Sequence, residues 1–222
     1  MIKNIIYVIT LWMICSQTYA GIVVGGTRFI YPQNKQMITV PVENTDDKRP
    51  YLIQSRVEDE DGINKTKGFI ITPVIFQLDG NRKSLLRISL RKSDFKTDRE
   101  TLFWLNVRGI PATEVDTENK LQVIINSKFK LFYRPTGLTE PDFSHIRYEI
   151  VGREIKVINQ TPYYITVKSI EINEKEYSVS DMIPPFETLI ISTNIIHDKD
   201  SIVINYIGDL GGIVSRPVIF SK

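Results

Sequence analysis

The chain has 222 residues, a formal net charge of +2 at pH 7, one cysteine and two histidines. This nearly balanced charge is unlike the basic profile of nucleic-acid-binding proteins, so any electrostatic function must lie in a local patch. The only cysteine, Cys15, lies in a segment that we expect to be removed. The remaining chain can then form neither a disulfide nor a thiolate metal site, and its fold must be held by its core.

The N-terminal segment has the features of a secretory signal peptide. Lys3 supplies positive charge, residues 5–14 form a short apolar run, and small residues occupy the positions that signal peptidase reads. We expect a signal peptide over residues 1–20, cleaved after Ala20. The apolar run is shorter than the roughly 20 residues that a membrane-spanning helix needs. A lipid anchor on Cys15 is also disfavoured, because the residue before it is bulky.

Runs of β-branched and aromatic residues with a period of two dominate the rest of the chain. The predicted strands cover, in chain order, residues 37–40, 51–57, 85–90, 102–107, 121–133, 148–151, 155–158, 164–170, 187–192, 202–206 and 214–220. Polar turns separate these runs, and few segments have helical apolar spacing. Many short strands at this spacing predict an all-β fold of sandwiches or barrels.

A proline-containing segment at residues 134–141 separates two β-rich halves and is the expected linker. We place one domain at residues 21–136 and another at residues 140–222. The halves also share a local pattern, in which Asn44 and Asn159 each precede a proline, a tyrosine and a strand. This pattern suggests two domains of similar architecture.

No constellation of residues favours catalysis or a metal site. His145 and His197 have no ligand spacing around them, and no GxSxG motif is present. The segment Asp59-Glu60-Asp61-Gly62 lacks the alternating acidic pattern of a calcium loop, so a solvated hairpin turn is the better interpretation. We expect no catalytic residue, no metal and no cofactor, and an exported hydrolase is the least favoured hypothesis.

The segment at residues 121–135 is unusually long for one strand. Leu121, Val123 and Ile125 alternate along it, and Lys128, Lys130 and Arg134 interrupt it with charge. One interpretation is a central strand buried on both sides. The other is an edge strand whose apolar row is offered to another protein, since a long apolar edge recruits partners.

A lone cation, Arg28, stands in a second apolar run near residue 30. Cations in such runs are costly to bury unless an anion pairs with them. They can also pair within the chain or extend their charged ends to solvent. The residues alone leave these alternatives open.

Several segments in the correct order resemble PapD-like periplasmic pilus-assembly chaperones. The matching segments are residues 21–32, 44–55, 98–111, 130–135, 159–164 and 209–212, of which Lys-Leu-Phe-Tyr-Arg-Pro at 130–135 is the most specific. The resemblance implies two immunoglobulin-like sandwiches in an L arrangement, in a periplasmic protein without enzymatic activity. It also implies pilus subunits as clients, which receive a strand from the chaperone, and an outer-membrane usher as the next partner.

The resemblance assigns roles to the cations and to the apolar row. It implies that Arg28 and Lys130 bind the C-terminal carboxylate of a pilus subunit. It implies that Leu121, Val123 and Ile125 insert into the groove of that subunit. The first hypothesis is thus a binding protein, and the alternative is a structural immunoglobulin-like fimbrial or surface component.

The resemblance further implies that Glu100, Arg134 and Asp209 form an ion network between the domains. The short stretch between residues 110 and 121 is similar to the short-loop class, which typically assembles rod-like pili. No role for Lys128 follows from the resemblance. Two adjacent glycines, residues 25–26, depart from the family pattern, and the exposed edge makes self-association of the free protein plausible.

Overall fold

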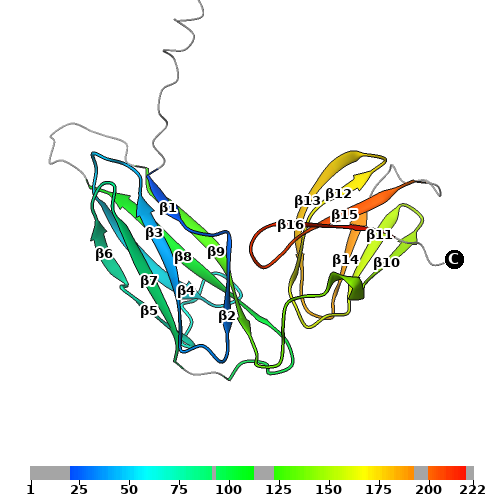
Figure 1. Cartoon of the computed structure of the whole chain (residues 1–222), viewed down its shortest axis with the longest axis horizontal. Coiled ribbons are helices and arrows are strands. Elements are labelled where there is room, and N and C mark those ends of the chain that lie inside the picture. Colours follow the sequence, from blue (N-terminus) through cyan, green and yellow to red (C-terminus); the bar gives the residue numbers. More distant parts are fainter. Residues whose placement is uncertain (1–20, 92–93, 113–122, 193–199, 219–222) are drawn as a thin grey trace, which may run out of the picture.

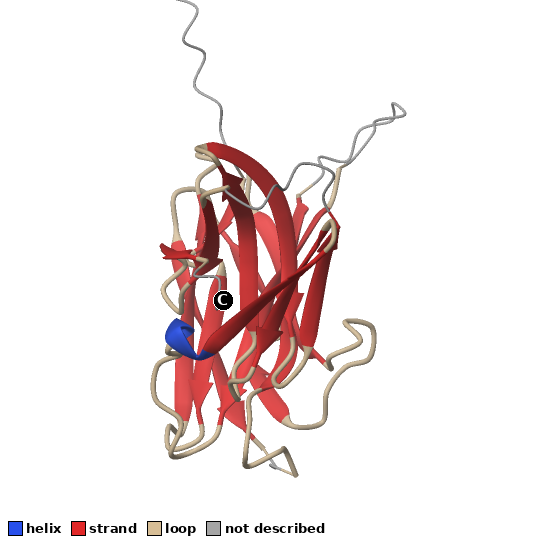
Figure 2. Cartoon of the chain, turned by 90° about the vertical axis from the view of Figure 1, so that its right-hand side faces the viewer, coloured by secondary structure: helices blue, strands red, loops and turns tan. Residues whose placement is uncertain are grey.

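The computed structural model describes residues 21–91, 94–112, 123–192 and 200–218. The expected signal peptide and Leu121 lie outside these residues. The described chain is built of strands, and its one helical element is the 3-10 helix η1, Phe143–His145 (Figure 2). The predicted all-β class is confirmed. No helix within the described ranges is long and apolar enough to cross a membrane.

The first domain is a sandwich of two sheets with the strand orders β1-β3-β7-β5 and β2-β9-β8-β4-β6. Its strands are β1 Ile22–Val24, β2 Arg28–Pro32, β3 Met37–Asn44, β4 Tyr51–Glu58, β5 Phe69–Thr72, β6 Ile75–Leu78, β7 Lys83–Leu90, β8 Thr101–Pro111 and β9 Ile125–Arg134. The pairing is antiparallel except between β2 and β9, which run parallel. The inner faces bury one core that includes Tyr31, Leu105 and Leu131.

Two adjacent glycines explain how the N-terminal strand joins both sheets. β1 pairs with β3 in one sheet, whereas β2 pairs with β9 in the other. The chain crosses between them at Gly25 and Gly26, where Gly26 has a φ of 154°. A Cβ on Gly25 would lie 2.5 Å from Pro41 Cγ, so only glycine fits this crossing. The departure noted in the sequence is therefore a sheet switch.

The second domain is a smaller sandwich with the strand orders β10-β11-β14 and β13-β12-β15-β16. Its strands are β10 Ile146–Val151, β11 Glu154–Asn159, β12 Ile165–Ile172, β13 Lys175–Ile183, β14 Thr188–Ser192, β15 Ile202–Ile207 and β16 Ile213–Pro217. Its core is a separate cluster that includes Ile155, Val167 and Tyr206. Alternate inward residues of both sheets supply that core, as in immunoglobulin-like sandwiches.

The two domains diverge from the connection that follows β9, so the molecule has the shape of an L (Figure 1). β2 and β9 lie on the side of the first domain that faces the second. A small apolar cluster of Leu102, Phe132 and Tyr164 joins the domains near the connection. The faces of β2 and β9 are thereby placed opposite the second domain.

The repeated asparagine pattern has the same structural role in both domains. Asn44 is fully buried and donates to the carbonyls of Arg49 and Leu78 at 2.8 and 3.1 Å. Asn159, which is 1% exposed, donates to the carbonyls of Tyr163 and Pro184, both at 2.8 Å. Each amide thus ties the following proline-containing turn to a neighbouring strand end, where buried backbone carbonyls need donors.

We predict that Asn159→Ala lowers the free energy of unfolding by about 2–4 kcal/mol, because it leaves several buried groups without partners. Urea unfolding followed by fluorescence measures the effect. Gln160→Ala is the matched control, since Gln160 is exposed and its removal should change stability by less than about 0.5 kcal/mol. Equal stabilities of the two variants would contradict this role.

Candidate functional site

The strand β9 is an edge strand in its first half and a central strand in its second half. Along one side it pairs with β8 from Ile125 to Tyr133. Along the other side it pairs with β2 only from Lys130 to Arg134. Within the described residues, no strand pairs with the outer edge of residues 125–129. Both interpretations of this segment therefore hold, each for one part of it.

The free edge carries exposed apolar side chains. Val123 is 68% exposed and Ile125 is 57% exposed. Along β9, Leu131 and Tyr133 point into the first domain's core, so alternation places Ile125 on the same face, beyond the end of that core. Another protein's strand could pair with this edge and cover the apolar row.

Two cations lie where the free edge ends. Arg28 of β2 and Lys130 of β9 are direct partners in the parallel register. Arg28 Nη1 donates to the carbonyl of Ile207 at 3.0 Å, and Lys130 Nζ donates to Thr166 Oγ1 at 3.3 Å. Both partners belong to the second domain, so both cations face it. The guanidinium of Arg28 also lies 5.8 Å from the ring centre of Phe132.

The environment of these cations favours an anion. Burial lowers the pKa of Arg28, and burial together with Arg28 lowers the pKa of Lys130. Neither forms a salt bridge to a carboxylate of the described chain. Two like charges held together in a half-buried site are destabilised until an anion neutralises them. A terminal carboxylate fits this demand, since it can accept hydrogen bonds from both side chains.

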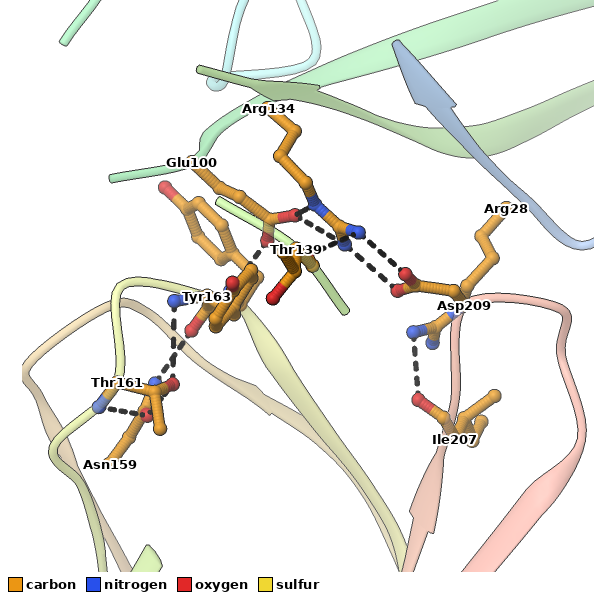
Figure 3. A network of polar contacts seen from close by, with 10 residues as sticks. Arg28, Glu100, Arg134, Thr139, Asn159, Thr161, Tyr163, Ile207 and Asp209 are labelled. Atoms are coloured by element: carbon orange, nitrogen blue, oxygen red, sulfur yellow. Dashed lines mark hydrogen bonds and ion pairs between the residues drawn. The ribbon is translucent and has the colours of Figure 1, made fainter. Parts of the chain in front are cut away.

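A third cation, Arg134, is occupied within the chain, as Figure 3 shows. Its guanidinium lies 2.8 Å from Glu100 Oε1 and 2.7 Å from Asp209 Oδ2. It also donates to the carbonyl of Thr139 at 3.0 Å. Burial works against its charge, but its hydrogen bonds to Asp209 and the attraction of Glu100 outweigh burial and raise the pKa of Arg134. The structure thus brings these three sequence-predicted residues together.

Lys128, for which the sequence offered no role, is also paired within the chain. Its Nζ lies 3.0 Å from Oε2 of Glu58, a fully buried residue at the end of β4. Lys128 Nζ also donates to the carbonyl of Gly62. Although Lys128 lies on the edge strand, its charge is directed at its own domain.

The sequence carries no signal for the groups that accept hydrogen bonds from the two cations. Thr166 gave no signal, because a threonine in a predicted strand needs no special role. The partner of Arg28 is the main-chain carbonyl of Ile207, which every residue possesses. The spacing of candidate metal ligands gave no site, and no group of three or more such side chains occurs in the described part of the chain.

The fold and site define a two-domain immunoglobulin-like protein with an open strand edge and, at its end, two cations that form no salt bridge within the described chain. Residues 21–139 match the family model "Pili and flagellar-assembly chaperone, PapD N-terminal domain", and residues 143–217 match "Pili assembly chaperone PapD, C-terminal domain". The chain belongs to the PapD family of pilus-assembly chaperones. The resemblance stated from the sequence is therefore confirmed.

Individual relatives agree with this assignment. The chain is 39% identical to the chaperone protein FocC of Escherichia coli, over 76% of each chain. It is 37% identical to the chaperone protein FimC of Escherichia coli K12, over 78% of this chain and 73% of the relative. A structure of the Salmonella enterica SafA pilin in complex with the SafB chaperone aligns with a TM-score of 0.80 and 29% identity, covering 94% and 99% of the two chains. These relatives are chaperones, not enzymes.

We predict that Arg134→Ala lowers the free energy of unfolding by roughly 3–5 kcal/mol, because it leaves the buried Glu100 without its charged partner. Chemical denaturation compares this variant with Arg153→Ala, which removes an exposed arginine outside the network. A loss for Arg134→Ala no larger than that of the control would show that the network does not stabilise the fold.

Proposed function

We propose that this chaperone captures pilus subunits by lending them the free edge of β9 and by binding their C-terminal carboxylate with Arg28 and Lys130. The observation that carries the proposal is the position of the cations. β2 covers the outer edge of β9 from Lys130 onward, so the free edge ends at the cation pair. A strand laid along this edge therefore ends where its terminal carboxylate is neutralised.

The geometry also sets the direction of the captured strand. If its C-terminus lies at Lys130 and its body extends along residues 129–123, it runs parallel to β9. The fixed carboxylate sets the register, and a slip by one residue would turn every apolar side chain to the opposite face. Leu121, Val123 and Ile125 would then enter the subunit groove. Burying three such side chains contributes about 5–9 kcal/mol, against an association cost of about 4–15 kcal/mol.

Burial of the apolar row therefore exceeds the cost of association by little or not at all. The affinity then depends on the contacts of the terminal carboxylate. Two cations within about 4 Å of a carboxylate, at an effective dielectric near 20, contribute on the order of 4 kcal/mol each before desolvation. The partner named with the SafB chaperone, the SafA pilin, supports a pilus subunit as the client.

The remaining steps follow from the family. Because the family consists of periplasmic chaperones, membership in it supports a periplasmic location and cleavage of the signal peptide after Ala20. We expect delivery of the subunit to an outer-membrane usher, and self-association of the free chaperone through its open edge. The short connection after residue 110 favours rod-like pili of the short-loop class. Most of that connection lies outside the described residues.

Co-expression with a candidate pilus subunit tests the proposal. We expect a one-to-one complex that survives purification, and a peptide with the subunit's C-terminal sequence should bind only with a free carboxylate. The alternative, a structural fimbrial component, predicts incorporation into fibres and no such complex. The pairing of β1 with β3 and of β2 with β9 argues against a structural component. A free N-terminal donor segment would not already be part of both sheets.

We predict that Arg28→Ala or Lys130→Ala abolishes detectable capture and leaves the fold intact, because each removes on the order of 4 kcal/mol of attraction for the carboxylate. Co-purification measures capture and circular dichroism measures the fold. Lys175→Ala, which removes an exposed lysine of the second domain, is the control and should capture normally. Normal capture by either cation variant would refute the anchor.

We also predict that affinity for the carboxylate peptide falls as pH rises. Burial and Arg28 lower the pKa of Lys130 in the free protein, whereas Asp181 opposes this shift. A bound carboxylate would raise that pKa, so the complex holds the proton more firmly than the free protein. Affinity is therefore full below the free-state pKa of Lys130 and is lost as pH rises through it. The loss begins at a lower pH than an ordinary lysine would give.

Titration calorimetry with the peptide, from about pH 7 to about pH 10, measures this dependence. Lys130→Arg is the matched variant, because a guanidinium remains charged throughout this range. Binding by Lys130→Arg should be nearly independent of pH. An identical pH profile for both proteins would assign the titration to another group.

A further inference from the structure

The turn at residues 59–62, which follows β4, is held against the larger sheet of the first domain. Trp104 Nε1 on β8 donates to the carbonyl of Glu60 at 3.0 Å. Lys128 on β9 donates to the carbonyl of Gly62 and pairs with Glu58 at the base of the turn. Two neighbouring strands therefore fix the backbone of this turn.

The turn is also rigid within itself. Asp61 Oδ1 accepts hydrogen bonds from the amides of Ile63 and Asn64 at 2.8 and 3.0 Å. Gly62 has a φ of 64°, and a Cβ there would lie 3.3 Å from Trp104 Cδ1 and 3.4 Å from Lys128 Nζ. Both the conformation and the close approach favour glycine. A side chain on this turn is consequently presented at a fixed position.

The side chain so presented is that of Glu60, and its partner belongs to the other domain. Glu60 Oε1 accepts a hydrogen bond from Tyr164 Oη at 2.8 Å. Burial and Glu60 both raise the pKa of Tyr164, so its hydroxyl remains a donor. Glu60 is exposed, as the predicted solvated turn implies, but its carboxylate also accepts a hydrogen bond from the second domain.

Tyr164 connects three parts of the functional site. Its backbone amide donates to Glu100 Oε2 at 2.9 Å, within the Arg134 network. Its ring lies 5.6 Å from that of Phe132, two residues beyond Lys130 on β9. Two residues after Tyr164, Thr166 accepts from Lys130. A displacement of Tyr164 would thus move Thr166 away from the cation pair.

We propose that the hydrogen bond between Tyr164 and Glu60 is a second tie between the domains, in addition to the ion pairs of Arg134, and that this tie positions the second domain's groups beside Arg28 and Lys130. Tyr164 is then a positioning residue for carboxylate binding, and Lys128 supports it by fixing the turn. The functional part of this inference rests on the proposed capture of a subunit's C-terminal carboxylate.

Two measurements on the same variants test the tie. Because the chain after Ala20 has no cysteine, Thr39→Cys and Lys175→Cys place one spin label on an exposed site of each domain. Double electron–electron resonance then gives the distribution of distances between the two labels. Calorimetry gives the affinity for a peptide with a free C-terminal carboxylate. The variants are Tyr164→Phe, Glu60→Ala, their double variant and Glu60→Gln. The control is Tyr177→Phe, which changes a tyrosine of β13 that takes no part in the contact between the domains.

We expect Tyr164→Phe and Glu60→Ala to broaden or shift the distance distribution and to weaken peptide binding about three- to tenfold. The double variant should bind the peptide as well as either single variant does, because both substitutions remove the same hydrogen bond. Glu60→Gln retains an acceptor oxygen and should rescue both readouts, and Tyr177→Phe should leave both unchanged.

An unchanged distance distribution in Tyr164→Phe would overturn the tie. Independent, additive losses of affinity in the double variant would also overturn it, since the two residues would then act separately. If the parent protein fails to bind the peptide, the proposed function fails. The distance measurement then still decides whether Glu60 and Tyr164 hold the domains together.

Discussion

The buried guanidinium of Arg134 is the interaction on which the rest of the functional site depends. It is bonded to Glu100 of its own domain and to Asp209 of the other. Asp209 lies two residues after Ile207, whose carbonyl holds Arg28, and Arg134 lies four residues after Lys130 on the same strand. The network therefore fixes the surroundings of both Arg28 and Lys130 at once.

The parallel pairing of β2 with β9 determines what the strand can do. Where β2 is present, β9 is central, and its residues from Leu131 to Arg134 are buried. Where β2 is absent, the backbone of β9 is open, which in most proteins invites aggregation. The internal pairing of Lys128 with Glu58 keeps a charge beside this open edge without offering it to a client. Lys128 therefore adds no unpaired charge to the open edge.

The sequence predicted most of the long strands and the charged members of the site, but the nine-residue β13 was missed. The runs at residues 51–57 and 102–107 became β4 and β8, because alternation is clear over many residues. The runs of three or four residues in β1, β5 and β6 were missed, since so few positions carry no reliable period. The partners supplied by Ile207 and Glu60 depend on tertiary contacts, which periodicity does not encode.

The orientation of two domains requires more than one contact. A single contact at Arg134 would allow the second domain to rotate about it, and a buried ion network gives specificity at a high desolvation cost. Tyr164 supplies a second contact through Glu60. Phe186 supplies another, since its ring centre lies 4.8 Å from the guanidinium of Arg99. Contacts made through several different elements restrict this rotation, so Arg28 and Lys130 are held in a fixed arrangement.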